Sequence, residues 1–86
     1  MKIIYKKGDH VNVLDLSKVC LIEIYNSSVE FKVTDQAVFI ESISLNRILN
    51  KEDKNKLALA FAKMKDKDAI YFFDEFVDKV LGKVNK

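Results

Sequence analysis

The alternation of apolar and polar residues changes its period once along the chain, near residue 44. Before that point, β-branched and aromatic residues alternate with polar ones, which is the period of a half-buried strand. After it, apolar residues recur every three to four positions, as in a helix that packs on a core. The pattern therefore predicts a sheet-forming first half and a helical second half.

Five stretches of the first half have strand character. In chain order they are residues 2–6, 11–16, 19–25, 29–34 and 37–43. The last three are joined by short turns, at 26–28 and at 35–36, and they predict an antiparallel meander. The first two flank Gly8 and Asp9, which favour a turn, and they predict a hairpin that either extends the meander or packs across it.

The lengths of the two turns predict the register of the meander. We expect Tyr25 to lie opposite Val29. We also expect Thr34 to lie opposite Ala37. The face that we interpret as the core face then carries Leu21, Tyr25, Val29, Phe31, Val33, Val38 and Ile40. The opposite face carries Cys20, Ile22, Ile24, Phe39 and Ile43 among Glu30, Lys32, Thr34 and Glu41. A slip of one residue would exchange the two faces.

The helical half divides into two elements. The first is expected over residues 51–65, with Asn50 as its N-cap and Asp53 as the partner in a weak form of the capping box. The second is expected over residues 69–82, with Gly82 at its C-terminus. Segment 65–68 interrupts the helical period between them.

The second predicted helix contains four of the nine aromatic residues. On a helical wheel, Phe73 and Phe76 lie in a broad apolar stripe, and we interpret them as core residues. Phe72 lies at the border of that stripe. The opposite side carries the acidic residues and the fourth aromatic: Tyr71, Asp74, Glu75 and Asp78.

These elements predict an α+β fold in a single domain, residues 1–86. About four to five antiparallel strands over residues 2–43 are followed by a C-terminal helical hairpin, 51–65 and 69–82, that packs on one face of the sheet. An apolar fraction of 49% and a charged fraction of 33% are typical of a globular domain. Helices on one side leave the other side of the sheet open.

The amino-acid composition limits the disulfide and metal chemistry available to the protein and indicates its cellular compartment. With one cysteine, Cys20, and one histidine, His10, we expect neither an internal disulfide nor a thiolate or imidazole metal site. We interpret Cys20 as a small buried hydrophobe. The apolar runs are too short for a signal peptide or for the roughly 20 residues of a membrane helix. We predict a cytoplasmic protein with no cofactor, no metal and no membrane partner.

The ratio of lysine to arginine also indicates the kind of genome that encodes the protein. Arg47 is the only arginine, and the other fourteen of the fifteen basic residues are lysines. Together with abundant Ile and Asn, this bias is typical of an AT-rich genome. A phage or mobile element would produce such a composition, and so would a chromosomal gene from an AT-rich genome.

Few residues could carry catalysis. The sequence has no glycine-rich phosphate loop, dinucleotide fingerprint or nucleophile elbow. Glu23 falls on the predicted core face, where burial would raise its pKa and make it a candidate functional group. The preferred alternative is that Glu23 lies near a sheet edge or pairs with a lysine. We predict that the protein is not an enzyme, and a small enzyme or ligand-binding domain around Glu23 stays as an alternative.

The two predicted helices have opposite charges. Residues 51–67 contain six lysines and three acidic residues, whereas residues 68–82 contain one lysine and four acidic residues. A nucleic-acid-binding module would use Lys54, Lys56, Lys63 and Lys65. This alternative is not favoured, because a pI of 8.6 is lower than is typical of such domains and the lysines fall on two sides of the helical wheel.

The prediction of function is based on the open face of the sheet. Ile22, Ile24 and Phe39 would form more apolar surface than a sheet usually leaves bare. We predict a small non-enzymatic interaction protein that acts through the open face by self-association, by binding a larger protein partner as its regulator or inhibitor, or by both. The residues expected to contact a partner are Ile22, Ile24, Glu30, Lys32, Phe39, Glu41, Tyr71, Asp74 and Asp78.

Overall fold

The computed structural model of the protein describes residues 1–33, 39–64 and 68–83, and only the backbone of Phe39 and Ile40. Within these residues, six strands form two three-stranded sheets, and two α-helices follow the meander. The predicted α+β class is confirmed, but the strands are divided between two sheets. None of the described helices has the length and apolar composition needed to cross a membrane.

The first sheet has the strand order β3–β4–β5 and is the predicted antiparallel meander. Its strands are β3 (Val19–Ile24), β4 (Ser28–Val33) and β5 (Phe39–Ser44). Pairing between β3 and β4 shifts between Val19 and Leu21, as at a β-bulge. The predicted turn at 35–36 lies outside the described residues.

The second sheet has the strand order β2–β1–β6. Strands β1 (Lys2–Lys7) and β2 (His10–Asp15) form the predicted hairpin around a turn in which Gly8 has a φ of 60°. β6 (Ile70–Phe72) pairs in parallel with β1. The hairpin therefore does not extend the meander. A short 3-10 turn, Leu16–Lys18, connects β2 to β3.

The first helix, α1, begins where it was predicted and spans Lys51–Lys63. The backbone N–H of Asp53 donates to Asn50 Oδ1 at 2.7 Å, and the backbone N–H of Asn50 donates to Asp53 Oδ2 at 3.2 Å. This reciprocal pair is the predicted capping box.

The second helix, α2, spans Phe73–Leu81 and begins four residues later than predicted. The difference arises because residues 70–72 are extended and pair with β1. Its C-terminal end was predicted correctly, since Gly82 has a φ of 87° and donates its N–H to the carbonyl oxygen of Asp78 at 2.7 Å.

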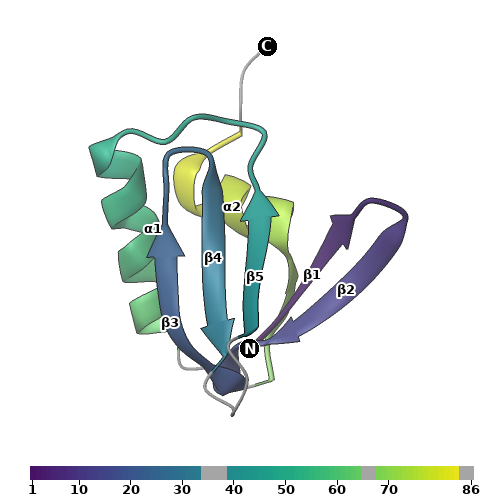
Figure 1. Ribbon diagram of the computed structural model, residues 1–86. Coiled ribbons are helices and arrows are strands. Elements are labelled where there is room, and N and C mark those ends of the chain that lie inside the picture. Colours follow the sequence, from purple (N-terminus) through teal and green to yellow (C-terminus); the bar gives the residue numbers. More distant parts are fainter. Residues whose placement is uncertain (34–38, 65–67, 84–86) are drawn as a thin grey trace.

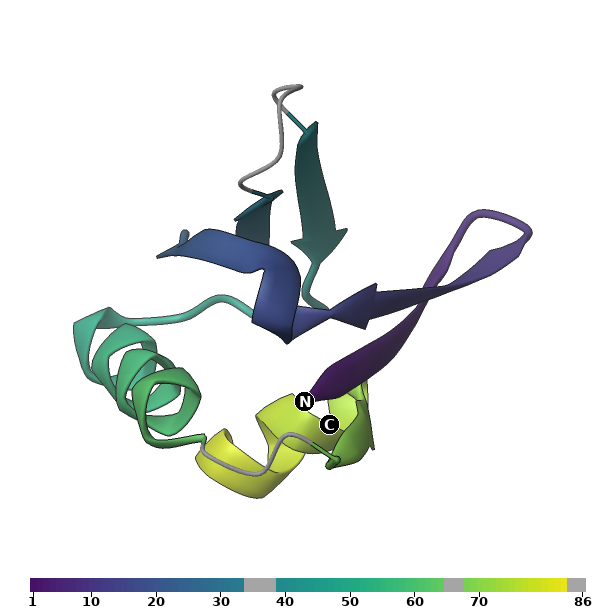
Figure 2. The same cartoon turned by 90° about the horizontal axis from the view of Figure 1, so that it is seen from below.

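Both helices lie on the same face of the β3–β4–β5 sheet, as predicted, and the β1–β2 hairpin projects to one side, next to β5 (Figures 1 and 2). The core lies between this sheet and the helices. The fully buried ring of Phe31 in β4 meets Phe61 of α1 and Phe73 of α2 edge to face, at centroid distances of 5.9 and 6.3 Å. Phe76 of α2 continues the cluster at 5.1 Å from Phe61. The core assignment of Phe73 and Phe76 is confirmed.

The predicted register of the meander is wrong by one residue at each turn. At the first turn, Ile24 lies opposite Val29. The reason is that this turn contains two residues, Asn26 and Ser27, closed by a hydrogen bond from the Tyr25 N–H to the Ser28 carbonyl oxygen at 2.8 Å. The prediction assumed a three-residue turn.

At the second turn, Val33 lies opposite Phe39 and Phe31 lies opposite Glu41, whereas Ile40 was expected opposite Phe31. The two slips have the same consequence, because a one-residue shift exchanges the faces of a strand. Ile22, Ile24, Glu41 and Ile43 therefore share the core face with Phe31, and Leu21, Glu23, Tyr25 and Lys32 face away from the helices.

Glutamate substitutions at two adjacent positions test this assignment of faces. Ile22→Glu places a carboxylate beside Phe31 and is expected to lower the free energy of unfolding by about 2 kcal/mol or more. Leu21→Glu places it opposite Lys32 on the outer face, and its effect should stay within about 0.5 kcal/mol. Urea unfolding of the two variants measures both values. The reverse order would restore the register predicted from the turns.

A polar cluster connects the two sheets. Lys7 Nζ at the end of β1 lies 2.9 Å from Glu41 Oε1 in β5, and Glu41 is only 7% exposed. Tyr5 of β1 is also buried and hydrogen-bonds to Glu41. Burial and the Glu41 carboxylate raise the pKa of Tyr5 to about 12.

This cluster predicts a loss of stability in alkali. The unfolded chain releases the Tyr5 proton near pH 10, whereas the folded protein keeps it until the pH approaches 12. The contribution is therefore complete below pH 10 and is lost as the pH rises from 10 to 12. Urea unfolding between pH 9 and 11.5 should show a smaller decrease in Tyr5→Phe than in the wild type. Equal decreases in the two proteins would contradict this role of Tyr5.

Candidate functional site

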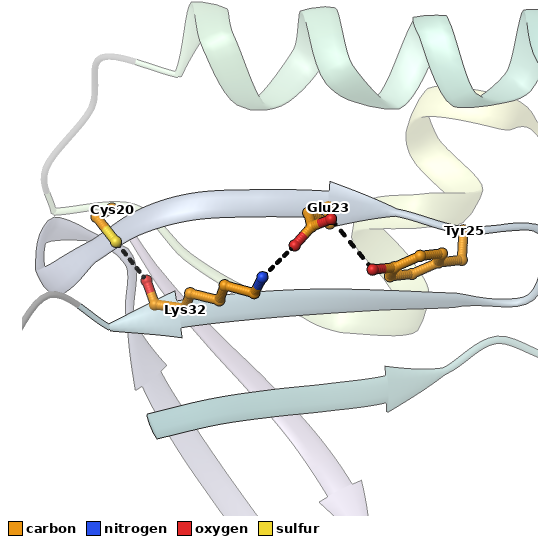
Figure 3. Close-up of polar contacts among 4 residues, drawn as sticks. All are labelled: Cys20, Glu23, Tyr25 and Lys32. Atoms are coloured by element: carbon orange, nitrogen blue, oxygen red, sulfur yellow. Dashed lines mark hydrogen bonds and ion pairs between the residues drawn. The ribbon is translucent and has the colours of Figure 1, made fainter. Parts of the chain in front are cut away.

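One candidate surface is the outer face of the meander, where four polar side chains form a connected cluster (Figure 3). Cys20 and Glu23 belong to β3, Tyr25 follows directly after it, and Lys32 belongs to β4. Lys32 lies one row from Glu23, because its direct partner across the strands is Leu21.

Glu23 is the centre of this cluster. Its Oε1 lies 2.5 Å from Lys32 Nζ, and its Oε2 accepts a hydrogen bond from the Tyr25 hydroxyl at 3.1 Å. Cys20 Sγ donates to the backbone carbonyl oxygen of Lys32 at 3.2 Å. Glu30 lies directly opposite Glu23, so Lys32 also offsets the repulsion between two like charges.

The pKa shifts follow from these contacts. The hydrogen bond from Lys32 and then that from Tyr25 lower the pKa of Glu23, and the carboxylate in turn raises the pKa of Tyr25 and of Lys32. A Glu23 that stays ionised does not supply the raised-pKa carboxyl group on which an enzyme was hypothesised. The expected alternative, a carboxylate on an edge strand paired with lysine, is the arrangement observed.

Cys20 is exposed, which corrects its interpretation as a buried hydrophobe. The cause is the shift in pairing between Val19 and Leu21, which leaves Cys20 out of the regular alternation. Cys20 borders a hollow of about 310 Å³ between β3 and α1. The other residues lining this hollow are Val19, Leu21, Ile22, Ile24, Ala58, Phe61 and Ala62.

The second candidate surface is the outer face of the β2–β1–β6 sheet. Ile4 of β1 lies opposite both Val13 of β2 and Phe72 of β6, so these side chains form one row across the sheet. Alternate residues of a strand share a face, which adds Val11 and Ile70. We call Ile4, Val11, Val13, Ile70 and Phe72 the apolar face.

Four of these side chains are largely exposed: Val11 by 64%, Val13 by 62%, Ile70 by 62% and Phe72 by 55%. The other face of the same sheet lies in the core, where Ile3, Tyr5 and Leu14 are buried. The sheet therefore has one face in the core and one face in solvent, where the exposed Lys2 and Lys6 of β1 lie on either side of Ile4 and the apolar side chains surround them.

A hollow of about 280 Å³ lies at one end of the apolar face, where β6 ends and α2 begins. Ile4, Val11 and Phe72 of the face line it, together with Ile43 and Phe73 of the core. Its other lining residues are Tyr5, Lys6, Ser44 and Asp74. This volume lies just below the roughly 300–1,000 Å³ of small-molecule sites and fits a side chain.

The predicted contact residues of the meander do not form one open surface. Ile22 and Ile24 are half-buried against the core, and Glu41 is buried beside Lys7. Glu30 and Lys32 lie on the outer face. The backbone of Phe39 begins β5, but its side chain lies outside the described part of the chain.

The predicted contact residues near the C-terminus are also separated. Tyr71 was expected on the acidic side of a helix, but it belongs to β6 and packs on Phe76 at 5.6 Å, with Lys79 Nζ 5.5 Å from its ring centroid. Asp74 is exposed in the first turn of α2. Asp78 Oδ1 forms an ion pair with Arg47 Nη2 at 2.8 Å, which connects the segment before α1 to α2.

The lysines of α1 do not converge on one phosphate site. Lys54 Nζ donates to Asn26 Oδ1 at 2.7 Å, and Lys56 forms an i,i+4 ion pair with Glu52 at 3.4 Å. Lys63 is exposed in the last turn, and Lys65 lies outside the described residues. In the part of the chain that the structure describes, no group of three or more potential ligands could hold a metal ion.

Sequence reasoning missed the apolar face, although a signal was present. The alternation Val11-Asn12-Val13 places both valines on one side of a strand, and Ile4 follows from the two-residue hairpin. Ile70 and Phe72 had no comparable signal, because the apolar run 70–73 suits a helix as well as a strand.

Comparisons of the chain with models of known protein families, with curated proteins and with solved structures find no match.

The contacts of Glu23 predict a measurable titration. Carbon-detected NMR of its carboxyl group should give a pKa below the ordinary value of 4.5. Lys32→Met removes the largest cause and should raise that pKa more than Tyr25→Phe, which removes the second. A Glu23 pKa that does not respond to Lys32→Met would show that the ion pair does not persist in solution.

Proposed function

We propose that the protein is a small non-enzymatic interaction protein that binds a protein partner through the apolar face. The observation that carries this proposal is the row Val13–Ile4–Phe72, continued by Val11 and Ile70, on a sheet face that no described element covers. Monomeric proteins seldom expose contiguous apolar patches, and such patches mark interaction sites.

The geometry suggests how a partner would bind. Burial of apolar surface contributes roughly 25 cal/mol per Å², and exposed aromatic residues such as Phe72 often dominate binding energy. The adjoining hollow would take an apolar side chain of the partner. Lys6 and Asp74 at the rim of the hollow would remain near water and would select the orientation of the partner.

The competing functions have weaker support. A nucleic-acid-binding α1 would present lysines on one side, but Lys54 and Lys56 have partners within the protein. An enzyme around Glu23 would use a carboxyl group with a raised pKa, whereas Lys32 lowers it. We place the protein in the reducing cytoplasm, where an exposed thiol such as that of Cys20 stays reduced. The kind of protein that we propose is a regulator or inhibitor from a phage or mobile element.

Replacement of Phe72 tests the proposed surface. Phe72→Lys should weaken partner binding by at least about 20-fold, because loss of a central aromatic residue costs about 2 kcal/mol or more. Leu59→Lys is the matched control, since Leu59 is 57% exposed on α1 and lies outside the apolar face. The measurement is quantitative affinity capture from the native cell, with each variant as bait and with circular dichroism as a check of folding.

A folded Phe72→Lys variant that captures the same proteins as the wild type and Leu59→Lys would refute the role of the apolar face. Binding to DNA or RNA that decreases steeply with salt and is lost in Lys63→Gln would instead favour the nucleic-acid alternative.

A further inference from the structure

The β2 strand has one edge paired with β1 and one edge that is unpaired among the described residues. The Leu16 N–H donates to the Met1 carbonyl oxygen at 2.9 Å, which continues the β1–β2 register. In an antiparallel pair, hydrogen-bonded and non-bonded residue pairs alternate. Leu14 and Asn12 therefore bond to β1, and the backbone groups of Val11 and Val13 point to the unpaired edge.

The opposite edge of β1 confirms this alternation. The Lys2 N–H donates to the Ala69 carbonyl oxygen at 2.8 Å, so the even-numbered residues of β1 direct their backbone groups toward β6. The residues opposite them on β2, including Val11 and Val13, direct theirs outward.

The other sheet edges are protected in ways that prevent pairing with another chain. β3 contains the irregularity after Val19 and has α1 alongside it (Figure 1). β6 has only three residues. β5 has the β1–β2 hairpin beside it, joined through Lys7 and Glu41. β2 has six residues, of sequence HVNVLD, with neither lysine, proline nor a shift in pairing.

We propose that the β2 strands of two copies of the chain pair antiparallel about a two-fold axis at Asn12. Val11 of each copy would then lie opposite Val13 of the other, and each of these two pairs would exchange two backbone hydrogen bonds. The β2–β1–β6 sheets of the two copies then become one sheet of six strands with the order β6–β1–β2–β2–β1–β6.

This pairing is self-complementary at the level of side chains. Residues opposite each other share a face, so the exposed valines of both copies join the two apolar faces into one surface. Asp9 and Asp15 would lie opposite each other beyond the paired segment, which limits the pairing to residues 10–14. The net charge of +2 adds little repulsion between copies.

The inference rests on the proposed function and deepens it, because it names a second copy as the partner at one edge of the apolar face. Backbone pairing of this kind supplies affinity through the main chain, and the side chains determine the register. The joined face, which Phe72 of each copy would border, remains available to a further protein.

Amide hydrogen exchange measured by NMR tests the pairing directly. In a concentrated sample that light scattering shows to be dimeric, the Val11 and Val13 amides should exchange at least tenfold more slowly than in a dilute, monomeric sample. The Asn12 and Leu14 amides should be protected in both, because they bond to β1. A dimer in which Val11 and Val13 exchange as fast as in the monomer, or a chain that stays monomeric at millimolar concentration, would overturn the proposal.

Two variants at one position separate backbone pairing from side-chain contact. Val13→Pro removes an N–H that points to the unpaired edge and leaves the bonds to β1 in place, so the dimer should be lost. Val13→Ala keeps the N–H and should retain a dimer. If Val13→Pro fails to fold, the wild-type exchange pattern still decides. A folded Val13→Pro variant that dimerises like the wild type would overturn the proposal.

The two proposals fail in different ways. Phe72 lies on β6, two strands from the β2 edge, so Phe72→Lys should leave the Val11 and Val13 protection unchanged. Rapid exchange at Val11 and Val13 together with loss of partner capture in Phe72→Lys overturns the dimer and supports the apolar face. Protected Val11 and Val13 together with undiminished capture in Phe72→Lys overturns the role of the face and supports the pairing.

Discussion

The burial of Phe31 determines the arrangement of the meander and both helices. Its ring is fully buried, and it meets Phe61 and Phe73 edge to face, which is the favoured geometry of aromatic pairs. Because strand residues alternate between faces, the position of Phe31 also turns Val29 toward the helices and Glu30 and Lys32 away from them. Pairing then transmits the same choice to β3 and β5, so that Ile22 and Ile43 join the core.

Local sequence signals predicted the elements that local interactions determine. The five strands of the first half, the capping box at Asn50 and the glycine end of α2 each depend on residues within a few positions of one another. The register depends on the number of residues in a turn, and the segment 26–28 did not distinguish a two-residue from a three-residue turn. β6 was missed for a different reason: three apolar residues have no period of their own, and their partner β1 lies almost seventy positions away.

The error in register also misplaced the candidate site. Ile22 and Ile24 were expected in solvent and lie against the core, while Glu23 was expected in the core and lies beside Lys32 on the outer face. The open face of the meander is consequently a polar surface, stabilised by an ion pair that holds Glu23 in its charged form. The uncovered apolar surface belongs to the β2–β1–β6 sheet, whose third strand, β6, was not predicted.

The placement of the two helices explains why the apolar face is uncovered among the described residues. Both helices lie over the β3–β4–β5 sheet (Figure 2). The β2–β1–β6 sheet contributes Ile3, Tyr5 and Leu14 to that same core, which leaves no described element to cover its second face. A solvent-facing side of an antiparallel sheet usually carries polar residues. Here Val11, Val13, Ile70 and Phe72 are exposed on the same face as Lys2 and Lys6, and the proposed partner would cover these four apolar side chains.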